Sequence, residues 1–272
     1  MSQRSKWFTQ EYLNWIIIGL MYITYILPVL FPFSPPLTIG EKATRFYNIV
    51  ESLPEEPYIL MAYDYSPVSY PLFQGLQEAF MKHIYSKNGR VICVAFSADG
   101  AMMYQKMEIT FGYVWNTKTY GEDYVFLGYI PGGETGLASF LSSIRSVIAT
   151  DFRGNLIDDL PIMKNIDTCT DFDLVIDCET GTTLGDGFVR QVSTVYKTTL
   201  AIACSGGATL EPYYPDQLQA NLYPLPQVGA EYETLIKEPG NASAQLGVLF
   251  LGALYFILLF IFGNIARIFK RG

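Results

Sequence analysis

The 272-residue chain has few of the side chains on which common catalytic centres depend. It has one histidine, His83, which lies away from the predicted strand ends. No other histidine is available for a Ser-His-Asp or Cys-His centre or for a histidine-based zinc site. No C-x-x-C occurs among its four cysteines, so we expect no zinc cluster, and we assign no residue to a metal site. His83 falls late in a helical pattern, and we predict it to be a cation at a helix C-terminus or a surface residue.

Nucleotide-binding signatures are missing as well. The chain contains no G-x-x-x-x-G-K-[ST] sequence, no G-x-G-x-x-G follows its first strand-like run, and the glycine-rich segment 181–187 matches neither pattern. The chain has 18 Lys and Arg against 26 Asp and Glu, a net charge of −8, which argues against nucleic acid as a partner. We therefore predict no cofactor.

The cysteines allow two interpretations. Cys93 and Cys204 lie inside apolar, strand-like runs, where cysteine usually serves as a small buried hydrophobic residue. Cys169 and Cys178 could form a disulfide across a short loop if the domain is outside the cytoplasm.

Two long uncharged stretches, 12–40 and 239–266, lie near the ends of the chain. About 20 apolar residues in a helix cross the roughly 30 Å hydrocarbon core of a bilayer. Segment 246–265 contains 14 Leu, Ile, Val or Phe residues and no charge, so we predict a membrane span there, the alternative being a buried core helix. The first stretch is less apolar, and a cleaved signal peptide is its alternative.

The short tails predict the orientation. Both are basic, and the positive-inside rule then places both termini in the cytoplasm and the middle of the chain outside it. The basic tail residues are Arg4, Lys6, Arg267, Lys270 and Arg271.

We divide the chain into seven segments on this basis. They are a cytoplasmic tail (1–12), a first membrane helix (13–33), a juxtamembrane amphipathic helix with its linker (34–56), an α/β domain (57–236), a linker (237–244), a second membrane helix (245–266) and a basic cytoplasmic tail (267–272). Thr38 and Glu41 have the spacing of a capping box at the start of the amphipathic helix.

The middle segment alternates between strand-like and helical patterns. Its strand-like runs are continuously apolar, as in strands buried on both faces. The runs are 58–63, 91–96, 124–130, 172–177 and 199–204, and the helical segments are 72–86, 98–113, 135–150, 187–196 and 229–236. This alternation predicts a doubly wound, mostly parallel, five-stranded Rossmann-like α/β sheet between the two membrane helices.

Polar residues follow the predicted strands, at the edge where open α/β sheets bind ligands. We call this edge the strand-end rim. Its candidate ligand-binding residues are Asp64, Ser66, Ser97, Asp99, Gly132, Gly133, Glu134, Glu179, Ser205 and Gly206. The four carboxylates could converge on a cation or a polar ligand. The alternative is ordinary turn and cap chemistry, which requires the same residue types.

Several short motifs resemble an uncharacterised family of prokaryotic two-span membrane proteins. The similar segments are 62–67, 120–125, 127–129, 144–145, 150–151, 171–175 and the Gly-Ala-Glu-Tyr-Glu segment 229–233. The resemblance covers most of the chain and implies the same architecture. It implies no activity, and no catalytic residue can be transferred.

Three functions remain as hypotheses. The first is a non-enzymatic subunit of a membrane protein assembly, whose partners are the lipid bilayer and either other copies of the chain or other membrane proteins. A tyrosine-rich chain, with 20 Tyr, suits contact surfaces. The second is a ligand-binding or sensory module that uses the strand-end rim. The third is an enzyme with carboxylate chemistry, which needs paired carboxylates with separated pKa values.

Overall fold

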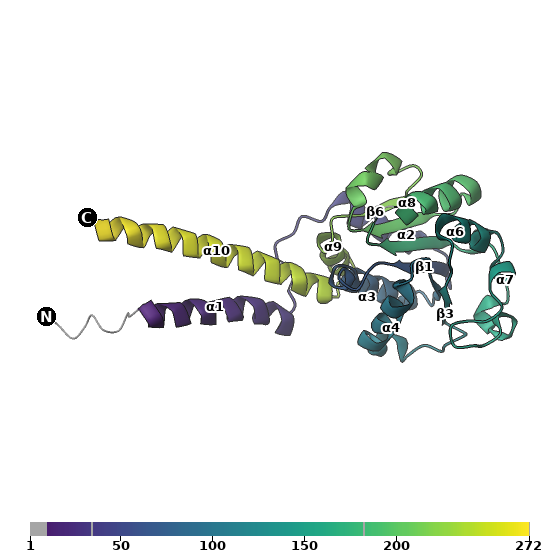
Figure 1. Cartoon of the computed structure of the whole chain (residues 1–272), viewed down its shortest axis with the longest axis horizontal. Coiled ribbons are helices and arrows are strands. Elements are labelled where there is room, and N and C mark those ends of the chain that lie inside the picture. The colour runs from purple at the N-terminus through teal and green to yellow at the C-terminus, as the bar shows by residue number, and fades with distance from the viewer. Residues whose placement is uncertain (1–9, 34, 182, 272) are drawn as a thin grey trace.

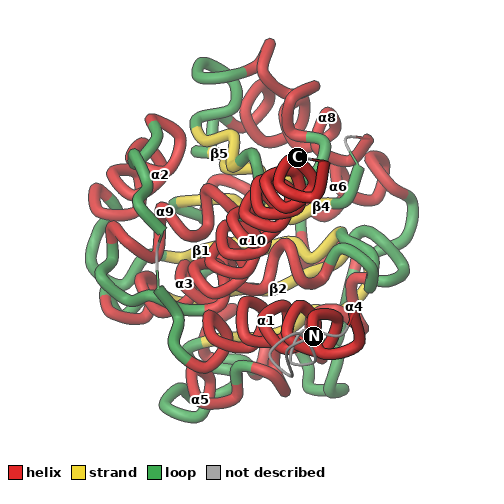
Figure 2. The backbone as a smooth tube through the Cα atoms, turned by 90° about the vertical axis from the view of Figure 1, so that its left-hand side faces the viewer, coloured by secondary structure: helices red, strands yellow, loops and turns green. Residues whose placement is uncertain are grey.

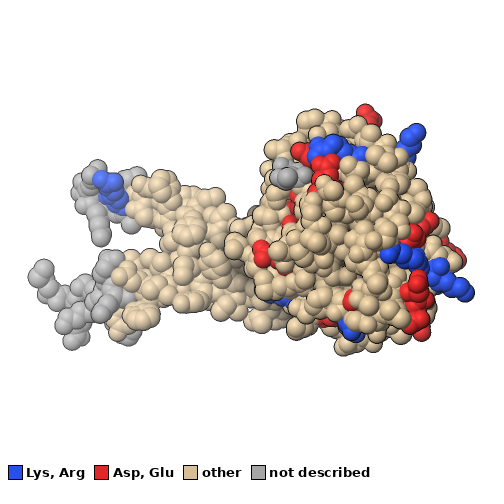
Figure 3. All heavy atoms as spheres, turned by 45° about the vertical axis from the view of Figure 1, so that its right-hand side comes forward, with Lys and Arg blue, Asp and Glu red and all other residues tan. Residues whose placement is uncertain are grey.

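The computed structural model describes residues 10–33, 35–181 and 183–271. Two long helices, α1 (Gln10–Leu30) and α10 (Asn241–Arg271), extend side by side from one end of an α/β domain (Figure 1). Both are long and apolar enough to cross a membrane, over Tyr12–Leu30 and Asn241–Ile265. On the face shown in Figure 3, charged side chains are scattered over the domain and are missing along most of the two helices.

The domain contains a fully parallel sheet of six strands in the order β3-β2-β1-β4-β5-β6. The strands are β1 (Tyr58–Asp64), β2 (Arg90–Ala95), β3 (Tyr124–Tyr129), β4 (Leu174–Glu179), β5 (Leu200–Cys204) and β6 (Ala220–Leu222). The prediction of a parallel α/β sheet is confirmed, but five strands was wrong. The sixth has only three residues, one of them the polar Asn221, and its pattern is too short to detect in the sequence.

Helices cover both faces of the sheet. The face toward α1 and α10, the candidate membrane helices, carries α2 (Glu41–Ser52), α3 (Tyr70–Ser86), α4 (Gly100–Thr110), α5 (Gly112–Trp115) and α9 (Gln227–Leu235). The opposite face carries α6 (Gly133–Ser142), α7 (Ile144–Val147), α8 (Thr183–Phe188), the π-helix η5 (Val189–Tyr196) and the short turns η2 (Ile157–Asp159), η3 (Pro161–Met163) and η4 (Cys169–Asp171). We call these the membrane-facing and distal layers.

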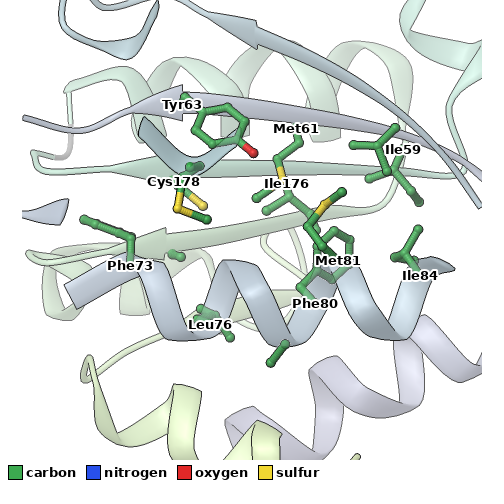
Figure 4. Packing of buried hydrophobic residues seen from close by; sticks show 14 of the residues in the cluster. Ile59, Met61, Tyr63, Phe73, Leu76, Phe80, Met81, Ile84, Ile176 and Cys178 are labelled. Atoms are coloured by element: carbon green, nitrogen blue, oxygen red, sulfur yellow. The ribbon is translucent and has the colours of Figure 1, made fainter. Parts of the chain in front are cut away.

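The alternation of side chains along each strand divides the core in two. On β1, Ile59, Met61 and Tyr63 face the membrane-facing layer, whereas Leu60 and Ala62 face the distal layer. Figure 4 shows the first set packed against α3. Both sets are at most 1% exposed, which explains why the strands read as continuous apolar runs.

Two long predicted helices are interrupted in the structure. Segment 98–113 forms α4 and α5 with a break at Phe111, and segment 135–150 forms α6 and α7 with a break at Ser143. Ser143 is extended, with φ of −165°, and its side chain accepts a hydrogen bond from Ser146 N. A serine that caps a new helix therefore ends the preceding one.

Helix α2 is part of the domain core, although we placed it in a segment that precedes the domain. Its residues Ala43, Phe46 and Val50 are buried in the membrane-facing layer. The predicted capping box was wrong, because α2 begins after Gly40 and has no side-chain cap. The carboxylate of Glu231 on α9 accepts the Gly40 N–H instead, at 3.0 Å.

The cysteines are all free and buried. The alternative disulfide between Cys169 and Cys178 is not formed, because the two side chains lie in the cores on opposite faces of the sheet. All four therefore behave as small buried hydrophobic residues.

Helix α10 is attached to the domain by a specific junction. The buried carboxylate of Glu233 accepts hydrogen bonds from the N–H groups of Gly240, Ala242 and Ser243, at 2.7–2.9 Å. It therefore caps the first turn of α10. Gly75 on α3 allows Ala242 to approach closely, since a Cβ at position 75 would lie 2.4 Å from Ala242 N. We call these contacts the α10 junction.

Candidate functional site

The reversal of strand order lies between β1 and β4, the two central strands. In open α/β sheets, this switch point is where ligands bind, beyond the carboxyl ends of the strands. Asp64 is the last residue of β1 and Glu179 the last of β4, and the two are register partners. The structure therefore brings these two predicted site residues together.

A third carboxylate, Asp177, lies on the same face of the sheet. It is the register partner of Ala62, two residues before Glu179, and both β1 and β4 direct these alternate positions toward the distal layer. The exposed fractions of Asp64, Asp177 and Glu179 are 6%, 0% and 2%. We call these three residues the carboxylate cluster.

Only part of the carboxylate cluster is satisfied by hydrogen bonds. Asp64 Oδ1 accepts the N–H groups of Phe96 and Ser97, at 2.7 and 2.6 Å. Among the described residues, neither oxygen of Asp177 has a hydrogen-bond partner. Burying an unpaired carboxylate is strongly unfavourable, so the group retains its proton instead.

The pKa values follow from this burial. Loss of solvation raises the pKa of Asp64 to about 7, against the opposing hydrogen bonds from Phe96 and Ser97. It raises the pKa of Glu179 to about 8, against a hydrogen bond from the Gly185 backbone. Burial, followed by the nearby charges of Glu179 and Asp64, raises the pKa of Asp177 well above its usual range. Glu179 and Asp177 are therefore mostly protonated near pH 7, whereas Asp64 is close to half ionised.

Thr180, directly after β4, connects three of the rim loops. Its hydroxyl accepts the Ser66 N–H at 2.8 Å, its N–H donates to Asp64 O at 3.3 Å, and its carbonyl accepts the Ser205 hydroxyl. The Gly206 N–H donates to Cys204 Sγ at 3.2 Å. Ser66, Ser97, Ser205 and Gly206 thus lie around the carboxylate cluster as half-buried turn residues.

The other predicted rim residues are engaged elsewhere. Asp99 is exposed before α4, and its side chain does not cap that helix. Glu134, which follows Gly132 and Gly133 at the start of α6, accepts two hydrogen bonds from Arg190, at 2.9 and 2.7 Å. These bonds lower the pKa of Glu134 to about 2.

Asp99 and Glu134 are thus not members of the buried carboxylate cluster, and the convergence of all four predicted carboxylates on one ligand stays a prediction. The sequence analysis missed Asp177 and Thr180. An acid at the end of the apolar run 172–177 was the available signal for Asp177. Within the described ranges, no group of three or more His, Cys, Asp or Glu side chains has a geometry that could hold a metal ion.

His83 forms a second polar cluster, with Glu51 and Tyr232, at the C-terminal end of α3. Nδ1 lies 2.7 Å from the Tyr232 hydroxyl and Nε2 lies 3.2 Å from Glu51 Oε1. Its position in the last turn of α3 is as predicted, but a surface location was wrong, because α2 and α9 leave the side chain only 7% exposed. Burial lowers its pKa, against the opposing effect of the hydrogen bond that the ring donates to the Glu51 carboxylate.

Comparisons with known proteins give no match: no protein-family model, no curated protein and no solved structure is similar to the chain. The resemblance to a two-span membrane family therefore stays a prediction.

Proposed function

We propose that the protein is a membrane-anchored, non-enzymatic subunit of a membrane protein assembly, with a Rossmann-like domain that makes protein contacts. The observation that carries the proposal is the α10 junction. A domain on a flexible tether needs no buried carboxylate to fix the first turn of its anchor, whereas Glu233 holds three backbone N–H groups there. A fixed junction gives the domain one orientation relative to the bilayer and presents the same surfaces to neighbouring proteins.

The burial of the carboxylate cluster supports a role without catalysis. A catalytic acid or base must reach its substrate within hydrogen-bond distance. Asp64, Asp177 and Glu179 are at most 6% exposed, and Glu134 is occupied by Arg190.

Native mass analysis of the full-length protein, extracted from its membrane in mild detergent, tests the proposal. We expect a defined complex heavier than one 30.6 kDa chain. Glu233→Ala, which loosens the junction, is expected to weaken that complex, and Glu238→Ala, at a side chain that is 57% exposed, is the matched control. A lone monomer with no associated protein would overturn the proposal.

The orientation is proposed with the function: both termini in the cytoplasm and the domain outside it. The basic tail residues support it through the positive-inside rule. Protease added to the outside of intact spheroplasts should cleave the domain. Cleavage only after the membrane is permeabilised would contradict this orientation.

A second function, a ligand-binding or sensory module, is favoured by one observation. The half-buried turn residues Ser66, Ser97, Ser205 and Gly206 surround the switch point, where open α/β sheets bind ligands, and a ligand that contacts them needs no access to the buried carboxylates. A thermal-shift screen with inorganic cations, polyamines and sugars tests this function. A shift that Ser97→Ala abolishes and the exposed Asp99→Asn retains supports it. A shift equal in both variants places the ligand elsewhere.

A further inference from the structure

Helix α4 exposes a partly apolar outer face. Met103, Tyr104 and Met107 point into the core, whereas Met102 and Ile109 are 49% and 82% exposed. These two residues, seven apart, lie on one side of a helix, and the exposed Lys106 lies between them. Isolated exposed apolar residues are common, so the location of this face decides its meaning.

The outer face of α4 is directed toward the membrane helices. In Figure 1, the layer that contains α3, α4 and α9 lies between the sheet and the pair α1 and α10. Figure 2, seen from the side of the membrane helices, shows the sheet behind this layer. The side of α4 that faces away from the sheet therefore faces the predicted bilayer.

The N-terminus of α3 connects this face to the membrane helix. The Lys106 ammonium lies 4.1 Å from the centre of the Tyr70 ring, at the first residue of α3. One residue later, the Pro71 carbonyl accepts a hydrogen bond from Gln245 Nε2 at 2.6 Å. Gln245 immediately precedes the uncharged segment 246–265. The start of α3 thus contacts both α4 and the last polar residue before the lipid-spanning part of α10.

Two further exposed residues lie next to α3, one in the sequence and one by contact. Val68 lies two residues before α3 and is 89% exposed, and Tyr113, in α5, is 57% exposed. The Tyr113 hydroxyl donates to Glu78 on α3. Tyrosine is enriched at the headgroup level of bilayers, where its ring is in contact with lipid and its hydroxyl with polar groups.

We propose that Val68, Met102, Lys106, Ile109 and Tyr113 form a membrane-contact surface that rests in the headgroup region of the bilayer crossed by α10. Apolar side chains at this depth leave water, and Lys106 faces lipid phosphates. The contact fixes the tilt of the domain together with the α10 junction. This proposal rests on the membrane placement in the proposed function, and it names the residues of the domain that contact lipid.

Spin labels on single introduced cysteines test the surface in full-length protein reconstituted in phosphatidylcholine and phosphatidylglycerol vesicles. The native cysteines are at most 1% exposed and should not compete for the label. Ile109→Cys and Met102→Cys report on the surface. Val195→Cys, at a 60% exposed position of the distal layer, is the water control, and Leu258→Cys on α10 is the bilayer control. The readout is the accessibility of each label to oxygen relative to a polar nickel chelate.

We expect the labels at positions 102 and 109 to give an oxygen-to-nickel ratio above that at 195 and below that at 258. A ratio at 109 equal to that at 195, with a lipid-like value at 258, would overturn the membrane-contact surface alone. Water-like values at all positions would overturn the membrane placement itself. Strong coupling between labels at position 109 of two molecules would show that a second copy covers the face, and would also overturn the proposal.

Discussion

Asp64 and Glu179 lie opposite each other at the carboxyl ends of β1 and β4, on the same face of the sheet. Sheet geometry places two acids side by side at the switch point, and Asp177 below them adds a third. The helices that cover the sheet exclude water from these side chains. Burial therefore favours the protonated form of the three carboxyl groups over an ionised form paired with a cation.

The carboxylate cluster should make stability depend on pH. A carboxyl whose pKa is higher in the folded than in the unfolded chain stabilises the fold below its ordinary pKa, and this contribution is lost as the pH rises through the folded value. The folded pKa values are about 7 for Asp64 and about 8 for Glu179. We expect the free energy of unfolding to fall between roughly pH 4 and pH 8, by up to about 1.4 kcal/mol per pH unit for each proton.

Denaturant unfolding of the full-length protein in detergent, at a series of pH values, measures this slope. Asp177→Asn removes one buried acid and should flatten the slope and increase stability at the alkaline end. Asp99→Asn, at an exposed position, should leave the slope unchanged. Equal slopes in the wild type and Asp177→Asn would show that the cluster does not titrate in this range.

His83 should titrate below its ordinary pKa. Burial disfavours the imidazolium, and the hydrogen bond that the imidazolium donates to Glu51 partly offsets this effect. Because the folded pKa is lowered below 6.5, the unfolded chain binds the proton more readily, and the contribution to stability is lost as the pH falls below 6.5. As the chain has one histidine, its ring resonance gives the pKa directly by NMR. Glu51→Gln should lower the pKa further, and an increase would contradict the assigned partner.

Glu233→Ala should loosen the first turn of α10. The substitution leaves buried N–H groups of Gly240, Ala242 and Ser243 without their acceptor, at a cost of about 1–3 kcal/mol. Hydrogen exchange of these amides should become faster and the melting temperature should fall. Glu238→Ala is the control, and we expect it to change stability by less than about 0.5 kcal/mol. Unchanged exchange at 240–243 would rule out the capping role.

Gly75→Ala should separate α3 from α10. The new Cβ would lie 2.4 Å from Ala242 N and 2.8 Å from Ala242 Cα, and backbone cannot move aside as a flexible side chain can. Overpacking of this kind typically costs about 1–3 kcal/mol. Gly112→Ala is the control, because its nearest neighbour would lie 3.8 Å away. Thermal unfolding in detergent compares the two, and equal melting temperatures would refute close packing at the junction.

Much of the architecture was readable from single segments of the sequence. Continuous apolar runs predicted five of the six strands, since a strand buried on both faces has no polar side. The two membrane-length helices were equally local signals. β6 was missed because three residues are too few to show the alternation of a strand. The break at Ser143 was missed because a serine that caps a helix cannot be told in the sequence from a serine on a helix surface.

The candidate site was only half predictable. Position after a strand indicated that Asp64 and Glu179 lie at neighbouring strand ends. Asp99 and Glu134 occupy equivalent positions in the sequence, but Asp99 is exposed and Glu134 is paired with Arg190. Which strands become neighbours depends on the order β3-β2-β1-β4-β5-β6, and strand order is a long-range property that no segment encodes by itself.

The sequence by itself determined the local properties: two apolar helices at the ends, an alternating α/β segment between them and an acidic surface. These follow from side-chain hydrophobicity and backbone propensity, which act over a few residues. The tertiary structure decided that Asp177 joins Asp64 and Glu179, that His83 is buried, and that Glu233 holds the start of α10. Burial and partners depend on residues far apart in the chain, and only folding brings those residues together.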